Sequence, residues 1–157
     1  CGATRIVACD LVPSRLDLAR KMGATDVVKV DEQDVCEIVD RLTGGVGADV
    51  VFETAGAAVA TQMTIRLARP GGTAVWLGFG KDEVAIPATM LVRKEVRVIG
   101  NRRYAHTYED AIRLVARGDV DVKSCVTHRF PFDKADEAIR FAAKGDPATI
   151  KVIIEVA

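Results

Sequence analysis

The chain has 157 residues, of which 49% are hydrophobic and 28% charged, so it can bury a core, and its length alone suggests one domain. Lys and Arg total 22, as do Asp and Glu, and this balance argues against binding to nucleic acid or to an acidic membrane surface. No apolar run reaches the length of a membrane helix, and no charged-then-apolar leader precedes the first strand, so we predict a cytoplasmic protein.

Four cysteines are spread along the chain without forming a metal-binding or redox motif. No two of them make a CxxC pair, which argues against a zinc ribbon and a dithiol site. We therefore expect buried or incidental thiols at Cys1, Cys9, Cys36 and Cys125. The sequence opens on Cys1 rather than on a methionine, so we also expect a piece of a longer protein.

The first predicted strand covers residues 6–10 and ends in an acid. Four apolar residues precede Asp10, a pattern typical of a strand buried on both faces of a parallel sheet. An acid at the carboxyl end of such a strand, with no phosphate-neutralising arginine beside it, suits the two hydroxyls of an adenosine ribose and would repel a 2′-phosphate. This interpretation predicts NAD rather than NADP. Asp10 could equally be a turn residue or a helix cap.

Predicted strands alternate with predicted helices as far as residue 100, which indicates βα units around a parallel sheet. The strands are expected at residues 6–10, 27–30, 49–53, 73–77 and 96–100. The helices are expected between Ser14 and Gly23, between Asp34 and Gly44, over residues 57–68 and over residues 89–94, with a short extended piece at 83–86. Capping boxes are predicted for Ser14 with Asp17 and for Asp34 with Glu37.

Small residues follow two of these strands at what would be the same edge of the sheet. Thr54-Ala55-Gly56 follows the third strand, and Gly78-Phe79-Gly80 follows the fourth. Turns of this kind let a ligand come close to the backbone. The two turns are therefore candidate parts of a binding site.

The pattern changes after Tyr104. Thr107 and Asp110 are expected to cap a helix that ends at Gly118, and a strand is expected at residues 125–130. Asp133 is expected to cap a further helix, and a last strand is expected at residues 149–156. We therefore predict two structural units, residues 1–104 and 105–157.

At this point the residues resemble a known family, the medium-chain dehydrogenases, and within it the zinc-dependent polyol branch of sorbitol and xylitol dehydrogenases. The motifs that carry the resemblance are Asp10 at the end of its strand, Glu53-Thr54-Ala55-Gly56, Gly71-Gly72-Thr73, Leu77-Gly78-Phe79-Gly80, and Val126-Thr127-His128-Arg129-Phe130-Pro131 with Lys134-Ala135 and Glu137-Ala138. Their order and spacing cover essentially the whole chain.

The resemblance implies an α/β fold, a doubly wound parallel sheet (Rossmann) lacking its first βα unit. Residues 1–104 would be an NAD-binding domain, and residues 105–157 would return to a GroES-like catalytic domain. The G-x-G-x-x-G turn and the ligands of the catalytic zinc would precede Cys1. No residue of this chain is therefore assigned to catalysis or to metal, and His106 and His128 are interpreted as surface or structural histidines.

The missing unit has a structural consequence. In the strand order 3-2-1-4-5-6 the strand that would precede Cys1 lies in the middle of the sheet. Its absence leaves three possible outcomes: direct pairing across the gap, filling of the gap by another chain, or a sequence that omits part of the protein. We expect the last.

The resemblance also implies site residues. Asp10 would bind the adenosine ribose, and Arg15 would lie near the adenine or be a solvated arginine of the first helical turn. Thr54 and Gly56 would approach the cofactor through their backbone. The nicotinamide ribose would be lined by Leu77, Gly78, Phe79, Asn101, Arg102 and Arg103.

Arg103 and Tyr104 match an Arg-Tyr pair that, in the polyol branch, points toward the substrate hydroxyls. Guanidinium and phenol donors suit a polyol. The family usually has a more apolar residue before this pair, whereas this chain has Arg102, and this leaves the substrate open.

The implied activity is reversible hydride transfer from a secondary alcohol of a sorbitol- or xylitol-type polyol to NAD, with zinc polarising the alkoxide. A homodimer or homotetramer through the last sheet strand is expected, although that strand could be a solvated edge protected by Arg93, Lys94 and Arg97. Two alternatives remain: another secondary-alcohol dehydrogenase of threonine or butanediol type, or a truncated, non-catalytic nucleotide-binding or interaction module.

Overall fold

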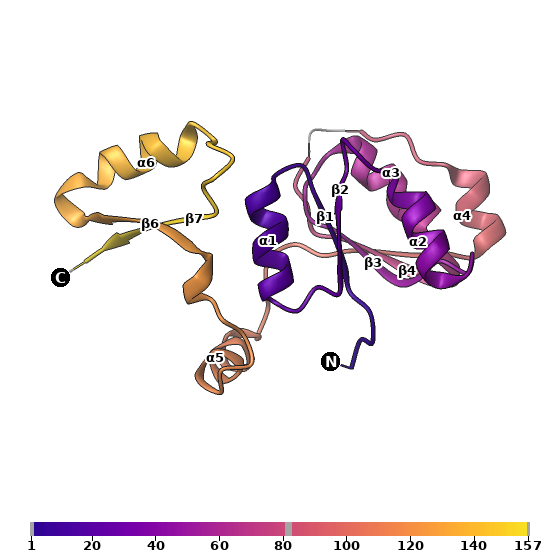
Figure 1. The fold of residues 1–157 in the computed structure, drawn as a ribbon, viewed down its shortest axis with the longest axis horizontal. Helices are drawn as coiled ribbons and strands as arrows, with labels where there is room; N and C mark the ends of the chain where they lie inside the picture. Colours follow the sequence, from indigo (N-terminus) through magenta and orange to yellow (C-terminus); the bar gives the residue numbers. More distant parts are fainter. Residues whose placement is uncertain (1, 81–82, 157) are drawn as a thin grey trace. The chain divides into compact units, whose positions relative to one another are not determined.

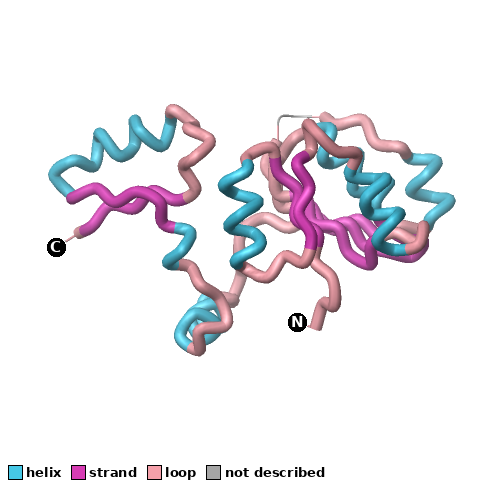
Figure 2. The backbone as a smooth tube through the Cα atoms, viewed as in Figure 1, coloured by secondary structure: helices cyan, strands magenta, loops and turns pink. Residues whose placement is uncertain are grey.

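The computed structural model describes residues 2–80 and 83–156, so a prediction for Cys1 lies outside the described residues. The chain forms two compact units, one of residues Asp34–Ala105 and one of Cys1–Gln33 together with His106–Ala157. Helices and parallel strands alternate along it, as Figures 1 and 2 show, and the α/β fold class is confirmed.

The chain begins with a βαβ unit made of β1 (Val7–Asp10), α1 (Pro13–Lys21) and β2 (Asp26–Lys29). The two strands are parallel, with Asp10 opposite Lys29. Leu16 of α1 and Val28 of β2 are buried, whereas Cys9 is exposed. The prediction that the first strand is buried on both faces is therefore wrong, because α1 packs on β1 and β2 but leaves Cys9 accessible.

The beginning of α1 also differs from the prediction. Val12 is the N-cap residue and Pro13 takes the first helical position, where its missing N–H costs nothing and its fixed φ fits the helix. No side chain caps the helix, so the predicted cap at Ser14 is wrong. Instead, the carboxylate of Asp10 accepts a hydrogen bond from the Val12 N–H at 2.9 Å.

The unit of residues 34–105 contains a three-stranded parallel sheet with helices packed on it. Its elements are α2 (Val35–Thr43), β3 (Ala48–Glu53), α3 (Ala58–Leu67), β4 (Ala68–Trp76), α4 (Ala88–Lys94) and β5 (Arg97–Gly100). The strand order is β3-β4-β5. Helix α3 packs on β3 and β4, α4 packs on β4, and α2 packs on α3. Ala68, Ala74 and Val96 form the buried core of the sheet.

Helix α2 begins and ends at the capping residues that the sequence predicted. Asp34 is the N-cap residue, and its carboxylate accepts hydrogen bonds from the N–H groups of Cys36 at 2.7 Å and Glu37 at 3.2 Å. Gly44 ends the helix in the left-handed conformation with φ 64°. The predicted cap and the predicted end of this helix are both confirmed.

The strands of the βαβ unit and those of residues 34–105 form separate sheets. No pairing joins β1 to β3 among the described residues, so this structure does not show direct pairing across the gap. Val50 and Phe52 of β3 are exposed, with relative accessibilities of 46% and 65%. One face of β3 is therefore apolar and uncovered.

The last part of the chain contains α5 (Tyr108–Ala116), β6 (Val126–Pro131), α6 (Ala135–Ala143) and β7 (Lys151–Glu155), with 3-10 turns at Lys123–Cys125 and Phe132–Lys134. Strands β6 and β7 are parallel. Phe141 of α6 packs against His128 and Phe130, with ring centroids 4.4 and 5.7 Å apart. The expected helices and strands are present.

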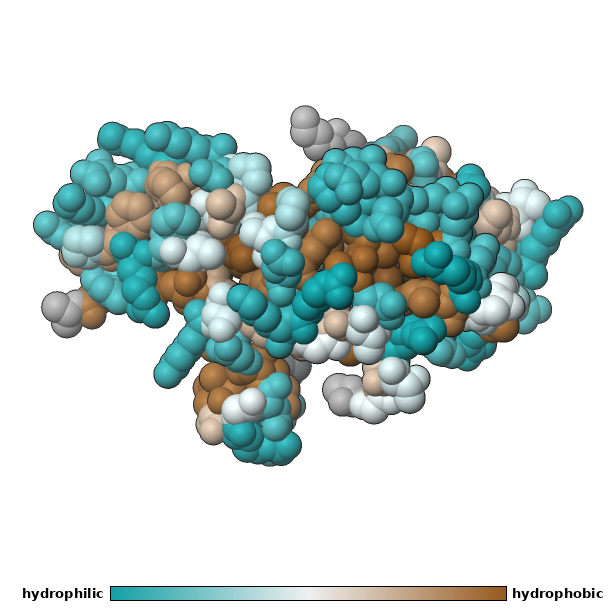
Figure 3. Space-filling view, in the orientation of Figure 1, coloured by the Kyte–Doolittle hydropathy of each residue, from teal (hydrophilic) through white to brown (hydrophobic). Residues whose placement is uncertain are grey.

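The side-chain caps predicted for this part are wrong, although the predicted N-cap position of α5 is right. Thr107 is the N-cap residue of α5, but no side chain forms a capping hydrogen bond there. Asp133 lies inside the 3-10 turn that precedes α6, and α6 also lacks a side-chain cap. The apolar residues of α5, Tyr108 and Ile112 among them, are exposed, and Figure 3 shows hydrophobic side chains gathered over this helix.

Candidate functional site

Three turns follow the three parallel strands of the 34–105 unit. They lie at the end of the sheet where all three strands have their carboxyl ends. Glu53 at the end of β3 is opposite Trp76 at the end of β4, and Trp76 is opposite Gly100 at the end of β5. The turns that follow are residues 54–56, 77–80 and 101–104. Ligands of open α/β sheets bind at this carboxyl edge, so the strand register brings together the residues predicted for the nicotinamide half of the site.

The first two turns are in direct backbone contact. A Cβ at Gly78 would lie 2.2 Å from the Gly56 nitrogen, and a Cβ at Gly80 would lie 2.3 Å from the Gly56 carbonyl oxygen. Gly56 itself has φ 70°, and a Cβ there would lie 2.7 Å from the Phe79 carbonyl carbon. Because real Cβ atoms do not approach this closely, the contact requires glycine at these positions.

Glu53 connects these two turns, although from the sequence it was named only within the Glu53-Thr54-Ala55-Gly56 motif and was not predicted as a site residue. The residue is 3% exposed. Its Oε1 accepts hydrogen bonds from the Ala55 and Gly56 N–H groups at 2.8 and 2.7 Å, and its carbonyl oxygen accepts from the Leu77 and Gly78 N–H groups at 2.8 and 3.0 Å. An acid at a strand end directly before a small-residue turn, as at Asp10, is the sequence signal that could have found it.

A cavity of about 240 Å³ lies at these turns. Its lining residues are Glu53, Gly56, Thr61, Trp76, Gly78, Gly80, Val84 and Ile86. The Trp76 indole N–H donates to the hydroxyl of Thr64 at 3.0 Å, and Thr64 is 2% exposed, so the tryptophan ring is anchored to α3. The cavity therefore combines a buried carboxyl group with an oriented aromatic ring.

The third turn contributes an arginine that faces the second. The Asn101 N–H donates to the Trp76 carbonyl oxygen at 2.9 Å, which holds the turn against β4. The Arg102 guanidinium carbon lies 5.0 Å from the centre of the Phe79 ring, a cation–π geometry. Arg103 has φ 63°, and Tyr104 is exposed at 61%. The structure thus brings Phe79 and Arg102 into contact.

Asp10 lies in the other compact unit, at the carboxyl end of β1. One carboxylate oxygen accepts from the Val12 N–H, and the other lies 3.9 Å from Arg15 Nη1. The side chains of Asp10 and Arg15 are 32% and 43% exposed. The sequence argument placed no arginine beside Asp10. This premise is wrong, because the first turn of α1 brings Arg15 to the carboxylate.

The thiols are free and less buried than expected. Cys9 is exposed, and Cys36 and Cys125 are half-buried. Burial, assisted by the nearby Asp34 carboxylate, raises the pKa of the Cys36 thiol above its ordinary value. Although Cys9 keeps more accessible surface than the other two cysteines, desolvation by burial still raises the pKa of its thiol. A raised pKa lowers the thiolate fraction at neutral pH, which argues against nucleophilic roles for these two cysteines.

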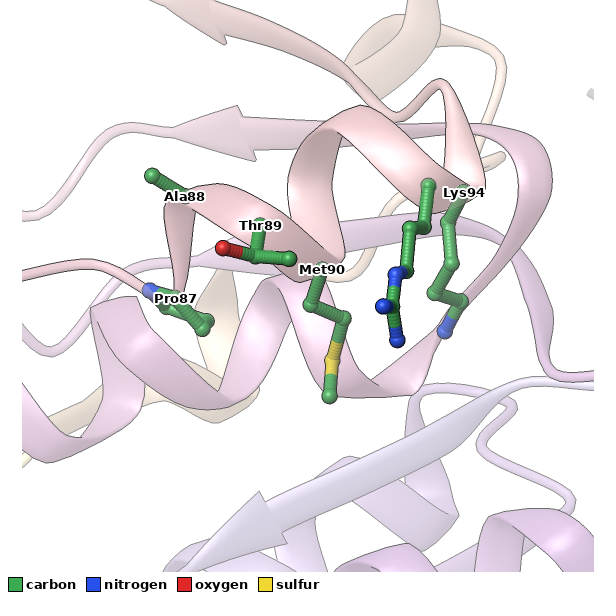
Figure 4. A pocket seen from close by; sticks show the side chains of 6 residues that line it. Pro87, Ala88, Thr89, Met90 and Lys94 are labelled. Carbon is green, nitrogen blue, oxygen red and sulfur yellow. The ribbon is translucent and has the colours of Figure 1, made fainter.

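A second, larger cavity of about 520 Å³ lies along α4 and is shown in Figure 4. Pro87, Ala88, Thr89, Met90, Arg93 and Lys94 line it. The Lys94 ammonium group already donates to the Ile65 and Arg66 carbonyl oxygens at the end of α3. The residues that line this cavity include none predicted for the site and no acidic residue, so we do not interpret it as the reaction centre.

Within residues 2–80 and 83–156, no three or more His, Cys, Asp or Glu side chains are grouped so that they could hold a metal ion. None of the helices found there has the length and apolar character needed to cross a membrane.

Known proteins are similar to this chain in sequence and in structure. The sorbitol dehydrogenase 1 of Saccharomyces cerevisiae is 36% identical over 98% of this chain and 45% of its own length. The crystal structure of an oxidoreductase/dehydrogenase of unknown specificity from Escherichia coli superimposes with a TM-score of 0.94 at 32% identity, over 99% of this chain and 45% of that one.

A third relative is a Sinorhizobium meliloti 1021 protein assigned to the zinc-binding dehydrogenases, whose crystal structure contains NADP. It superimposes with a TM-score of 0.85 at 28% identity and covers 99% of this chain and 46% of its own. The chain thus spans about half the length of these relatives. The profile of the family described as "Zinc-binding dehydrogenase" matches residues 1–117. The chain therefore belongs to the zinc-binding dehydrogenase family.

Proposed function

We propose that this chain is the cofactor-binding half of an NAD-dependent, zinc-containing dehydrogenase that oxidises a secondary alcohol of a sorbitol- or xylitol-type polyol to the ketose. The single observation that carries the proposal is the backbone contact between the Gly56 and Gly78 turns at the carboxyl edge of the sheet, with Glu53 bound to both. The family and the polyol dehydrogenase relative support the same assignment.

The turns fit the nicotinamide half of a dinucleotide. Glycines at positions 56 and 78 let the two turns pack directly on each other, and they place no side chain between this backbone and a ligand. Glu53 already occupies the N–H groups of Ala55, Gly56, Leu77 and Gly78. At these positions the backbone would therefore approach the cofactor through carbonyl oxygens, which suit the carboxamide NH₂ and the ribose hydroxyls.

The adenosine half is assigned to Asp10, whose carboxylate would accept hydrogen bonds from the two ribose hydroxyls. Arg15, at 3.9 Å, would hold this carboxylate in place or lie near the adenine. Because a guanidinium group can also bind a 2′-phosphate, the preference for NAD depends on whether Arg15 remains paired with Asp10. NAD remains the proposed cofactor.

The reaction transfers a hydride from the carbinol carbon to bound NAD, while the hydroxyl proton is released and the ketone forms. This chain would position the nicotinamide through Thr54, Gly56, Leu77, Gly78 and Phe79. We assign the zinc to the part of the enzyme that corresponds to the unmatched half of its relatives, and no step at the metal is derived from the residues described.

Donor groups at the third turn suit a polyhydroxylated substrate. We propose that Arg103 and Tyr104 donate hydrogen bonds to its hydroxyls, while Arg102, held against Phe79, lies at the nicotinamide ribose. Strand β5 is an edge of the sheet β3-β4-β5. We propose a homodimer or homotetramer formed through this edge.

The proposal is tested with the natural full-length protein. Intact mass and zinc content are measured on one sample, followed by NAD reduction with sorbitol, xylitol, threonine and 2,3-butanediol. A subunit about twice as long as this chain, with bound zinc and polyol-dependent NADH formation, is the expected result. Oxidation of threonine or butanediol alone would favour the other dehydrogenase type. A zinc-free protein of 157 residues that reduces no NAD would leave a nucleotide-binding or interaction module.

A further inference from the structure

Glu53 is a charged residue type in a nearly inaccessible position. Burying a carboxyl group is unfavourable unless hydrogen bonds compensate for the lost water. The 3% exposed side chain turns back over its own strand end, where Oε1 accepts from the Ala55 and Gly56 N–H groups. The carboxyl group therefore fixes the orientation of two successive peptide units in the first turn.

The same residue also holds the second turn. The Glu53 carbonyl oxygen accepts from the Leu77 and Gly78 N–H groups. Its Oε2 lies beside Gly78, where an added Cβ would be 2.3 Å away. The side chain thus binds the first turn and lies against the second, whereas any residue at position 53 would offer the same backbone carbonyl to Leu77 and Gly78.

Glu53 also lines the cavity between the turns, together with Gly56 and Gly78. Through these contacts it controls which backbone atoms of the turns face the cavity. We propose that Glu53 is a positioning residue for the nicotinamide half of the cofactor, acting as a hydrogen-bond acceptor that sets the two turns. This inference rests on the proposed function and gives a role to a residue that the sequence analysis named only as part of the Glu53-Thr54-Ala55-Gly56 motif.

The hydrogen-bond geometry suggests two variants that separate the loss of the charge from the loss of the hydrogen-bond acceptor. Both side-chain bonds end on the same oxygen, so Glu53→Gln keeps an acceptor for both N–H groups while it removes the charge. Glu53→Leu has a similar volume and removes the acceptor. Glutamine should therefore rescue the function that leucine abolishes, if hydrogen bonding rather than charge is what matters.

The experiment titrates NADH and AMP against the natural full-length protein and both variants. For Glu53→Leu we expect NADH to bind at least about tenfold more weakly, because two partly buried N–H groups lose their acceptor, and AMP to bind within about twofold of the wild type. For Glu53→Gln we expect NADH binding within about threefold of the wild type. Hydrogen exchange at the Ala55 and Gly56 amides should accelerate in Glu53→Leu only.

The two ligands separate a positioning role from a general structural role. Equal weakening of NADH and AMP, or unchanged NADH binding in Glu53→Leu, would overturn the proposal. If Glu53→Leu does not fold, Glu53→Ala is titrated in the same way, since water can then reach the two amides. Unchanged NADH binding there would likewise overturn it. A wild-type protein that binds neither NADH nor NADPH would overturn the proposed function as well.

Discussion

Gly78 lies against Gly56 so closely that a Cβ on Gly78 would be 2.2 Å from the Gly56 nitrogen and 2.3 Å from Glu53 Oε2. Neither the backbone nitrogen nor the buried carboxyl group can move aside easily. The contact between the two turns therefore requires glycine at position 78 for steric reasons.

Gly78→Ala should lower the free energy of unfolding by about 1–3 kcal/mol, because the new methyl group forces the two turns apart. The matched control is Gly100→Ala at the end of β5, where no atom lies within 4 Å of an added Cβ. It should change the stability by less than about 0.5 kcal/mol. Urea unfolding of both variants checks this, and equal effects would contradict the close contact.

Asp10→Ala should weaken NAD binding about tenfold or more, because two charge-assisted hydrogen bonds to the ribose are lost. NADP should be relatively spared, since the repulsion of its 2′-phosphate disappears and Arg15 is released from its 3.9 Å contact with the carboxylate. Cofactor titration by NAD(P)H fluorescence measures both affinities. Asp10→Ala combined with Arg15→Ala should remove the gain for NADP. Equal losses for NAD and NADP in the single variant would count against the ribose role.

Arg103→Gly should raise the KM for the polyol substrate while the fold is kept or slightly stabilised. Arg103 has φ 63°, a conformation that costs a non-glycine residue about 1 kcal/mol and that glycine adopts freely. Arg103→Ala also removes the guanidinium group but keeps the Cβ, so it separates the two effects. Kinetics and thermal melting of both variants test the idea, and an unchanged KM in both would exclude Arg103 from the substrate site.

Asp34→Ala should destabilise the protein by about 1 kcal/mol, because the N–H groups of Cys36 and Glu37 lose their acceptor. Ser14→Ala is the matched control, since α1 has no side-chain cap, and it should change the stability by less than about 0.5 kcal/mol. Chemical denaturation distinguishes the two. A comparable loss at Ser14 would mean that its hydroxyl caps α1 in solution.

Alkylation of Cys36 should reach half of its maximal rate at a pH above that of an unhindered thiol. The thiolate is the reactive species, and burial together with the Asp34 carboxylate raises the pKa of this thiol, so less thiolate is present at any given pH. Asp34→Asn keeps an acceptor for the Cys36 N–H and removes the charge, so it should lower the pKa. Iodoacetamide labelling with peptide mass mapping follows Cys36 alone, and a midpoint unchanged by Asp34→Asn would remove Asp34 as a cause.

Features that depend on neighbouring residues were predictable. The cap of α2 joins Asp34 to peptide groups two and three positions later, and its end requires only that Gly44 adopt a positive φ. The alternation of apolar strands and amphipathic helices indicated the α/β fold for the same reason. Where local signals compete, the prediction was wrong, as at Ser14, because the preceding Pro13 is a better first helical residue.

The sequence by itself determined the order of strands and helices, the two small-residue turns and the family resemblance, because each of these is encoded in short stretches of chain. Only the tertiary structure decided that Glu53 binds both turns, that Gly78 touches Gly56 and that Phe79 faces Arg102. These contacts depend on the register Glu53–Trp76–Gly100 across three parallel strands. That register pairs residues more than twenty positions apart in the sequence, which no local pattern specifies.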